Sequence, residues 1–222
     1  MPKKSGSIQL SEISTAEFSP VLGAEARLDL VDWYGKTAIR KSRIPKAYRI
    51  EQLDKLLRAR RTKEEVEILH AAKLAGVDCP EVYFADQESS EIVMEFVPGP
   101  LLKEIRDSSD ALFRKVGQYA GRLHSKGIIH GDLTTKNMIL SQERLVFIDF
   151  GLAFFSDRIE DGAEDLHLLK QVLKTETSLS KAISNFEAAM DGYSEIAGEN
   201  QTSEVKSQIA KIELRGRYAQ VD

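Results

Sequence analysis

Two polar segments set between short apolar stretches constrain this chain more than any other feature. The first runs from His130 to Asn137 and reads His-Gly-Asp-Leu-Thr-Thr-Lys-Asn, and the second is Asp149-Phe150-Gly151. The apolar residues around them predict short strands. Asp132, Asn137 and Asp149 are either ordinary turn and capping residues or members of one polar site, and their spacing between strands favours one site.

The order of the predicted elements indicates an α+β chain, with strands mainly first and helices mainly second. Leu28 and Leu30 alternate with polar neighbours at the period of two that is typical of a strand. Pro98-Gly99-Pro100 is the clearest break and predicts a boundary between lobes at residues 1–97 and 98–222. The expected strands lie at 20–26 (with a turn), 27–33, 37–41, 82–86, 91–97, 128–130, 138–140 and 145–148, and the expected helices at 50–75, 111–126, 163–175, 180–189 and 203–214.

Residues 50–75 lack glycine and proline and are rich in helix-forming residues. Thr62 followed by Glu65 has the spacing of a capping box, which predicts a new helix start at Thr62. Gly76 is expected to end the helix.

Composition indicates an ordinary globular protein, with 42% hydrophobic and 30% charged residues in 222. The single cysteine, Cys79, excludes an internal disulfide and fits a reducing cytosol, where it is expected to be a buried thiol. No apolar run reaches the ~18 residues of a membrane helix. No apolar core follows Lys3 and Lys4, so no signal peptide is expected and the predicted location is cytoplasmic.

The residue types of the polar segments suit phosphoryl transfer. That reaction needs a lysine on the phosphates, metal ions across them and a carboxylate that orients the attacking hydroxyl or water. Lys41 ends a predicted strand and is the candidate lysine, with Glu65 as its ion-pair partner. Asn137 and Asp149 are the candidate Mg²⁺ ligands, because Mg²⁺ prefers oxygen donors. Asp132 is the candidate catalytic base, and Lys41 the second candidate catalytic residue.

The spacing of His130, Asp132, Asn137 and Asp149-Phe150-Gly151 resembles the signature set of the protein kinases. The resemblance implies a bilobal protein-kinase-like fold with ATP and Mg²⁺ as cofactors. By the same resemblance His130 braces the backbone of the Asp-Phe-Gly segment. Asp165 is expected either to cap a helix or to brace the catalytic loop.

The resemblance to kinases also implies further nucleotide contacts. Met94 would be the gatekeeper residue or simply a core residue, and the backbone of Glu95 and Val97 would meet the adenine edge. Lys136, next to the catalytic carboxylate, would touch the γ-phosphate or stay in solvent. Gly23-Ala24-Glu25-Ala26 would be the phosphate loop, with one glycine where kinases usually have three.

Four segments narrow the resemblance to one family. Residues 43–49, 60–65, 130–135 and 214–217 are similar to the small kinase of the KEOPS (EKC) complex, whose eukaryotic relatives are called the p53-related protein kinases. The similarity covers roughly residues 23–217 and suggests an archaeal-type member. It implies an atypical Ser/Thr kinase or ATPase that binds the threonylcarbamoyl transferase subunit and other subunits of the complex. It also implies support of threonylcarbamoyladenosine formation on tRNA.

The chain departs from ordinary kinases after Gly151. Only about a dozen residues separate Gly151 from the helix expected near Ala163, and no Ala-Pro-Glu follows. An activation segment does not fit there, so the helical lobe is expected to be reduced and poor at selecting peptides.

Two basic regions are candidate tRNA surfaces. Residues 36–63 hold eleven basic and two acidic side chains in a chain of net charge −4. The alternative is a solvated helix face. The tail residues Arg215 and Arg217 precede Tyr218 and are the second candidate.

Competing hypotheses keep the fold and change the role. A pseudokinase-like scaffold would hold nucleotide without turnover, although every catalytic residue type is present. A RIO-type kinase of ribosome maturation would be expected to carry an N-terminal winged helix, for which residues 1–20 are too short. An aminoglycoside-type phosphotransferase usually has a larger helical lobe.

Overall fold

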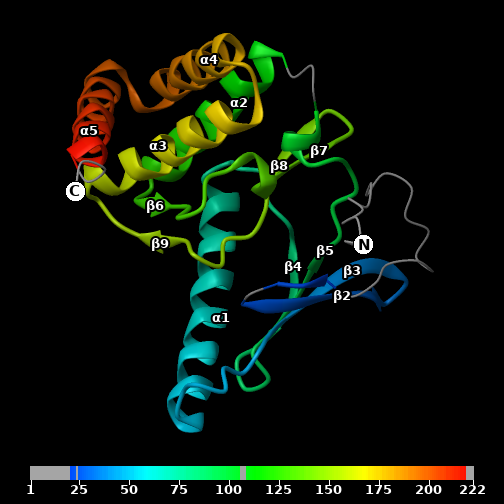
Figure 1. Cartoon of the computed structure of the whole chain (residues 1–222). Helices are drawn as coiled ribbons and strands as arrows, with labels where there is room; N and C mark the ends of the chain where they lie inside the picture. Colours follow the sequence, from blue (N-terminus) through cyan, green and yellow to red (C-terminus); the bar gives the residue numbers. More distant parts are fainter. Residues whose placement is uncertain (1–20, 24, 106–108, 219–222) are drawn as a thin grey trace, which may run out of the picture.

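The computed structural model describes residues 21–23, 25–105 and 109–218. An antiparallel sheet of five strands, in the order β1-β2-β3-β5-β4, opens the chain (Figure 1). A two-residue turn joins β2 to β3, with Tyr34 and Gly35 both at positive φ, the conformation that matches the twist of a hairpin. The strands are β1 (Val21–Leu22), β2 (Ala26–Trp33), β3 (Lys36–Arg43), β4 (Val82–Asp86) and β5 (Glu91–Glu95).

A single helix, α1 (Glu51–Leu74), stands beside this sheet, and the helix start predicted at Thr62 is wrong. The Thr62 hydroxyl is buried and donates to the carbonyl of Arg58 one turn earlier, so it caps nothing. Glu65 turns to β3 instead of back to Thr62. The helix ends before Gly76, as predicted. We call β1–β5 with α1 the N-lobe.

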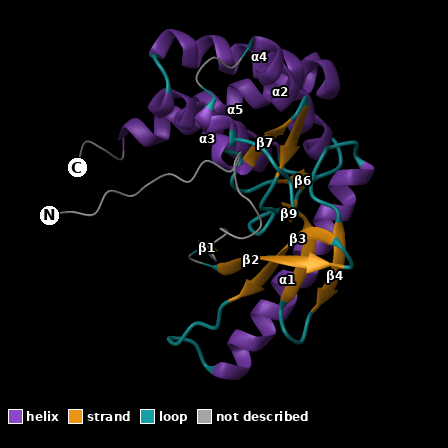
Figure 2. Ribbon diagram, turned by 90° about the vertical axis from the view of Figure 1, so that its right-hand side faces the viewer, coloured by secondary structure: helices purple, strands orange, loops and turns teal. Residues whose placement is uncertain are grey.

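The rest of the chain is mainly helical, and Figure 2 shows its helices grouped on one side of the N-lobe. Two short strand pairs, β6 with β9 and β7 with β8, lie between the helices and the N-lobe. The predicted boundary at residues 97 and 98 falls between β5 and η2 and stays a prediction. The elements are η2 (Leu102–Glu104), α2 (Asp110–His124), β6 (Ile128–Ile129), η3 (Thr135–Asn137), β7 (Met138–Ser141), β8 (Arg144–Phe147), β9 (Phe154–Phe155), α3 (Ile159–Glu176), α4 (Leu179–Ala197) and α5 (Glu199–Tyr218).

The last three helices are longer than the sequence pattern indicates. Helix α3 begins at Ile159, four residues before the expected start, so the segment after Gly151 is shorter than predicted. Helix α4 begins behind Ser178, whose hydroxyl accepts from the amide of Lys181, and Gly198 at positive φ ends it. Within the described residues, every helix is too short or too polar to span a bilayer.

The main core joins the C-terminal half of α1 to the helical part of the chain. Ile68 and Leu69 of α1 belong to the same buried cluster as Phe113, Leu166 and Tyr193. Cys79 is buried in this cluster as predicted, and burial raises the pKa of its thiol to about 12, so it stays a protonated structural residue.

Helices α2 and α4 cross at glycines. A Cβ added to Gly117 would lie 1.7 Å from the carbonyl oxygen of Ala189, and one added to Gly192 would lie 1.9 Å from that of Arg114. The two backbones can approach this closely only because neither position carries a side chain.

Replacing Gly117 by valine should therefore destabilise the protein strongly. Overpacking typically costs ~1–3 kcal/mol, and a clash with backbone on the facing helix belongs at the upper end of that range. Urea unfolding of Gly117→Val against Glu187→Ala, an exposed residue of α4, measures the effect. Equal midpoints for the two variants would contradict this helix crossing.

Candidate active site

A cluster of charges, buried at Lys41 and Glu65 and exposed at Asp149, connects three elements. Lys41 Nζ of β3 lies 2.6 Å from Glu65 Oε1 of α1 and 2.8 Å from Asp149 Oδ1, which follows β8. Glu65 is 2% exposed, so its carboxylate depends on cations for compensation. Burial lowers the pKa of Lys41, but the carboxylates of Glu65 and Asp149 more than offset this and raise it above its ordinary value. The structure therefore brings the predicted lysine, glutamate and aspartate together with the lysine charged.

Asp149 has an unusual backbone conformation, with φ of 58°. A non-glycine residue rarely adopts this region, and such strain is found where a side chain must be aimed. Burial raises the pKa of Asp149, while the charge and hydrogen bond of Lys41 lower it, and the net pKa lies below the ordinary value. The carboxylate is thus ionised at neutral pH, and its Oδ2 accepts no hydrogen bond from the described residues.

The loop of residues 130–137, which is the predicted catalytic loop, brings Asp132 and Asn137 together. Asn137 Nδ2 donates to the carbonyl oxygen of Asp132 and to its Oδ2, both at 2.9 Å. These two bonds fix the amide so that Asn137 Oδ1 remains an acceptor. The amide of Ile148 donates to the carbonyl of Asn137, which sets this loop beside the residue before Asp149. Lys136 Nζ lies 3.1 Å from Asp132 Oδ2, half in solvent, so it faces the carboxylate as predicted from its position.

Gly131 is required by the path of this loop. It has φ of 76°, and a Cβ there would lie 2.4 Å from the carbonyl oxygen of Leu152. No other residue type fits without moving the segment that follows Gly151.

Asp165 of α3 holds the catalytic loop from behind, which decides between its two predicted roles. Its Oδ2 and Oδ1 accept the backbone amides of His130 and Gly131 at 2.7 and 2.8 Å. The ring of His124 lies 3.3 Å from Asp165 Oδ2 and 3.3 Å from the hydroxyl of Tyr193. Sequence reasoning missed this chain of contacts, because no spacing rule links α2, α3 and α4.

His130 packs against Phe150 of the Asp-Phe-Gly segment, with ring centroids 4.7 Å apart. Burial lowers the pKa of His130, although Asp165 and Asp149 act in the opposite direction. The ring is therefore neutral at pH 7 and packs against the Phe150 side chain. The bracing of the segment's backbone, which the resemblance implies, stays a prediction.

The predicted phosphate loop and hinge flank the charge cluster. The amide of Gly23 donates to the carbonyl of Ala26, and Glu25 lies 2.7 Å from Arg61 of α1. Ala24 lies outside the described residues. Met94 is buried in β5. The amide of Glu95 donates a hydrogen bond to the backbone carbonyl of Glu81, whereas the amide of Val97 donates to no described residue.

Arg43 is a site residue that sequence reasoning missed. Its Nη2 lies 2.5 Å from Glu65 Oε2, on the other side of the carboxylate from Lys41. Positions 41 and 43 are two residues apart on β3, so their side chains point to the same face of the strand. This spacing was the signal from which a role for Arg43 beside Lys41 could have been predicted.

The basic segment at residues 36–63 is largely neutralised within the fold. Most of its cations pair with carboxylates, several of them on α1 itself, so less charge is free to attract phosphates than the sequence suggests. The pairs are Arg40–Asp29, Lys41–Glu65, Arg43–Glu65, Arg49–Asp54, Arg58–Asp54, Arg60–Glu64, Arg61–Glu25 and Lys63–Glu67. In the tail, Arg215 pairs with Glu160, and the side chain of Arg217 lies outside the described part.

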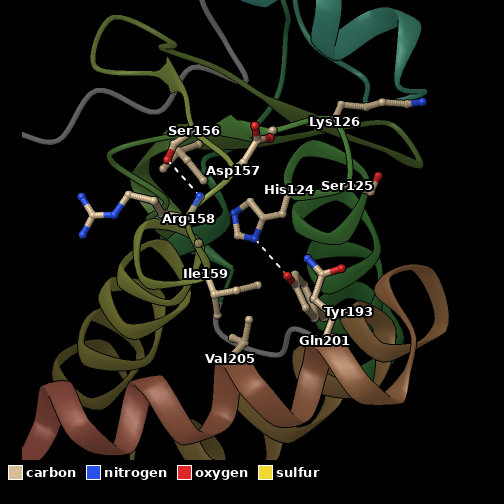
Figure 3. A pocket seen from close by; sticks show the side chains of 13 residues that line it. His124, Ser125, Lys126, Ser156, Asp157, Arg158, Ile159, Tyr193, Gln201 and Val205 are labelled. Carbon is tan, nitrogen blue, oxygen red and sulfur yellow. Dashed lines mark hydrogen bonds between the residues drawn. The ribbon is translucent and has the colours of Figure 1, made fainter.

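A cavity of about 300 Å³ lies between α2, α4, α5 and the start of α3 (Figure 3). His124 and Tyr193 line it, and their hydrogen bond is drawn in Figure 3. None of the predicted site residues belongs to its lining.

Residues 36–166 match the RIO domain family. The KEOPS complex subunit Bud32 of Pyrococcus abyssi is 44% identical over 207 residues, which cover 88% of this chain and 94% of that protein. A probable serine/threonine-protein kinase BUD32 homolog of Archaeoglobus fulgidus is 41% identical, with coverage of 90% and 95%. A probable bifunctional tRNA threonylcarbamoyladenosine biosynthesis protein of Methanobrevibacter smithii is 44% identical over 88% of this chain, which spans only 36% of that longer protein.

Solved kinases share the fold. The Rio2 kinase of Chaetomium thermophilum, in an ADP/Mg²⁺-phosphoaspartate complex, aligns with a TM-score of 0.62 at 16% identity, covering 89% of this chain and 70% of that one. WaaP in complex with acyl carrier protein aligns at 0.61 and 16% identity, with coverage of 90% and 87%. These likenesses confirm the predicted α+β, protein-kinase-like fold.

Replacing Asp165 by asparagine should loosen the catalytic loop. An amide can accept only one of the two backbone hydrogen bonds, and a buried donor left without a partner costs ~1–3 kcal/mol. Urea unfolding and hydrogen exchange at residues 130–132 should both show the loss, and Glu164→Gln, exposed on the same helix, should not. Unchanged exchange in Asp165→Asn would refute the bracing role.

Proposed function

The chain belongs to the RIO-domain family and, within it, to the Bud32 kinases, and on this premise we propose that it is the ATP-dependent kinase or ATPase subunit of a KEOPS complex. The predicted resemblance to that kinase family is confirmed by these relatives. An atypical Ser/Thr phosphotransferase is the activity that their names and the fold support. The observation that carries the proposal at the level of chemistry is the ion-paired cluster of Lys41, Glu65 and Asp149.

The names of two groups of relatives, short ones of about this chain's length and longer bifunctional ones, support the proposed pathway. Relatives in which this chain spans about a third of the protein are named as bifunctional in tRNA threonylcarbamoyladenosine biosynthesis. We therefore propose that the partner is a threonylcarbamoyl transferase subunit, with other KEOPS subunits, and that the work is done on tRNA in the cytoplasm. Arg215, Arg217 and the exposed part of the 36–63 segment are the proposed tRNA contacts.

Three residues would bind and orient the reacting groups. Lys41, charged and held by Glu65, would bind the α- and β-phosphates of ATP. Asp132 would orient the attacking hydroxyl or water, since Asn137 and Lys136 hold its carboxylate in one place. Lys136 Nζ lies beside the Asp132 carboxylate and would contact the γ-phosphate of bound ATP.

The donor set fits Mg²⁺. Asp149 offers an ionised carboxylate with one oxygen not hydrogen-bonded to described residues, and Asn137 offers an amide oxygen whose orientation is fixed. One carboxylate and one amide suit a hard cation that keeps waters and phosphate oxygens as its other ligands. When bound, the ion would neutralise charge on the phosphates. Within the described residues no group of three His, Cys, Asp or Glu side chains forms an alternative metal site.

The adenine side would be formed by the phosphate loop, including Gly23, Ala24, Glu25 and Ala26, and by the hinge. Val97 is suited to meet the adenine edge because its amide donates to no described residue, whereas the amide of Glu95 is already paired. A contact from Glu95 would therefore involve its carbonyl oxygen. Met94 would line the pocket from β5.

Asp132→Asn and Asp149→Asn test the proposal in different ways. Asp149→Asn should lose both Mg²⁺-dependent nucleotide binding and turnover, whereas Asp132→Asn should keep binding and lose turnover by about a hundredfold or more. Calorimetry with Mg²⁺-ATP and release of labelled phosphate measure the two effects. Asp157→Asn, outside the cluster, is the control. Wild-type turnover in both variants would contradict the assigned roles of Asp132 and Asp149, whereas nucleotide binding without turnover by the unsubstituted protein would favour a nucleotide-binding scaffold.

A further inference from the structure

Glu65 is held by two cations, and phosphoryl transfer needs only one of them. Lys41 occupies Oε1 at 2.6 Å and Arg43 occupies Oε2 at 2.5 Å. The second cation is as deeply buried as the carboxylate, with 4% of its side chain exposed. Burying a guanidinium costs several kcal/mol unless its partners compensate. Stability alone is a weak reason for such a group, because an apolar side chain fills the same space at lower cost.

Arg43 contacts α1 at two points one turn apart. Besides Glu65 Oε2, its Nη2 lies 3.3 Å from the backbone carbonyl oxygen of Arg61. Its Nε is buried without a partner among the described residues, so the guanidinium is positioned by its terminal nitrogen. The amide of Arg43 donates to the carbonyl of Ser90, which anchors the end of β3 to the turn before β5. Arg43 therefore ties α1 to the sheet independently of Lys41.

Arg43 also lies beside the Asp-Phe-Gly segment. A Cβ on Gly151 would lie 3.2 Å from Lys41 Nζ and 3.8 Å from Arg43 Nη2. Both cations contact Glu65, and Lys41 also contacts Asp149. Without nucleotide, Lys41 is shared by both carboxylates. A lysine that also binds phosphates would share its charge among more partners and hold Glu65 less tightly. Arg43 Nη2, by contrast, hydrogen-bonds only Glu65 and the Arg61 carbonyl among the described residues.

We propose that Arg43 is a positioning residue that keeps Glu65 and α1 in the lysine-pairing arrangement whether or not nucleotide is bound. This role rests on the proposed function. It implies that α1 holds Glu65 next to Lys41 without the help of a partner protein or of phosphorylation. Arg43 acts through Glu65 and is not assigned a contact with ATP.

The variant Arg43→Met tests this role while keeping most of the side-chain volume. Glu65 keeps Lys41 as a partner, so no unpaired buried carboxylate remains and the fold should persist. We expect kcat for ATP hydrolysis to fall about ten- to a hundredfold, with a smaller change in KM, because Lys41 is misplaced rather than removed. Arg43→Lys should restore most of the loss. Arg144→Met, on β8 with a partly exposed pair to Asp78, is the control and should behave as wild type.

Two further measurements separate positioning from general stability. The losses caused by Arg43→Met and Glu65→Gln should not add in the double variant, because both act on one carboxylate. Amide exchange at residues 61–66 should be the same with and without Mg²⁺-ADP in wild type, but faster without nucleotide in Arg43→Met. Turnover of Arg43→Met equal to that of Arg144→Met, losses that add fully, or unchanged exchange would overturn the inference.

The exchange measurement does not depend on turnover. If Asp149→Asn hydrolyses ATP as wild type does, the proposed function fails while the clamp of α1 by Arg43 is still tested by exchange. If Asp149 proves essential and Arg43→Met changes neither turnover nor amide exchange, only the proposed positioning role of Arg43 fails.

Discussion

The ion pair between Lys41 and Glu65 is the interaction on which the rest of this structure depends. It joins the third strand of the sheet to α1, and Asp149 extends it to the segment that follows β8. Because Glu65 is almost completely buried, the carboxylate cannot be left without a cation, and the position of α1 along the sheet is fixed by that need. The C-terminal half of α1 then enters the main core through Ile68 and Leu69, so one helix connects the charge cluster to the helical part.

The loop of residues 130–137, on the other side of the proposed site, is held by hydrogen bonds to its backbone rather than by ion pairs with the N-lobe. Asp165 accepts two consecutive amides of the loop that carries Asp132, and Asn137 closes that loop by bonding back to Asp132. Neither arrangement needs nucleotide. A carboxylate that must orient a reacting group gains from such pre-organisation, since the cost of ordering the loop is met during folding.

The sequence predicted the fold class, most of the strands and the residues that form the charge cluster, because the kinase-like spacing is carried by residues that few other folds need together. It failed where one residue has two possible partners. Glu65 had the spacing to cap a helix at Thr62 and the chemistry to pair with Lys41, and only the packing of α1 against β3 decides between them. Arg43 and His124 were missed for a related reason: their partners lie on other elements, at sequence separations of 22 and 41 residues, which no local pattern encodes.

The same logic bears on control of the proposed enzyme. Only Leu152 to Arg158 separate Gly151 from α3, and part of this stretch, β9, is already paired with β6. A segment this short and this anchored leaves little chain to order or release by phosphorylation. With α1 held by two cations and the catalytic loop held by Asp165, the site is assembled without a switch of its own. Regulation of the proposed enzyme is then expected to come from binding partners rather than from a rearrangement of this segment.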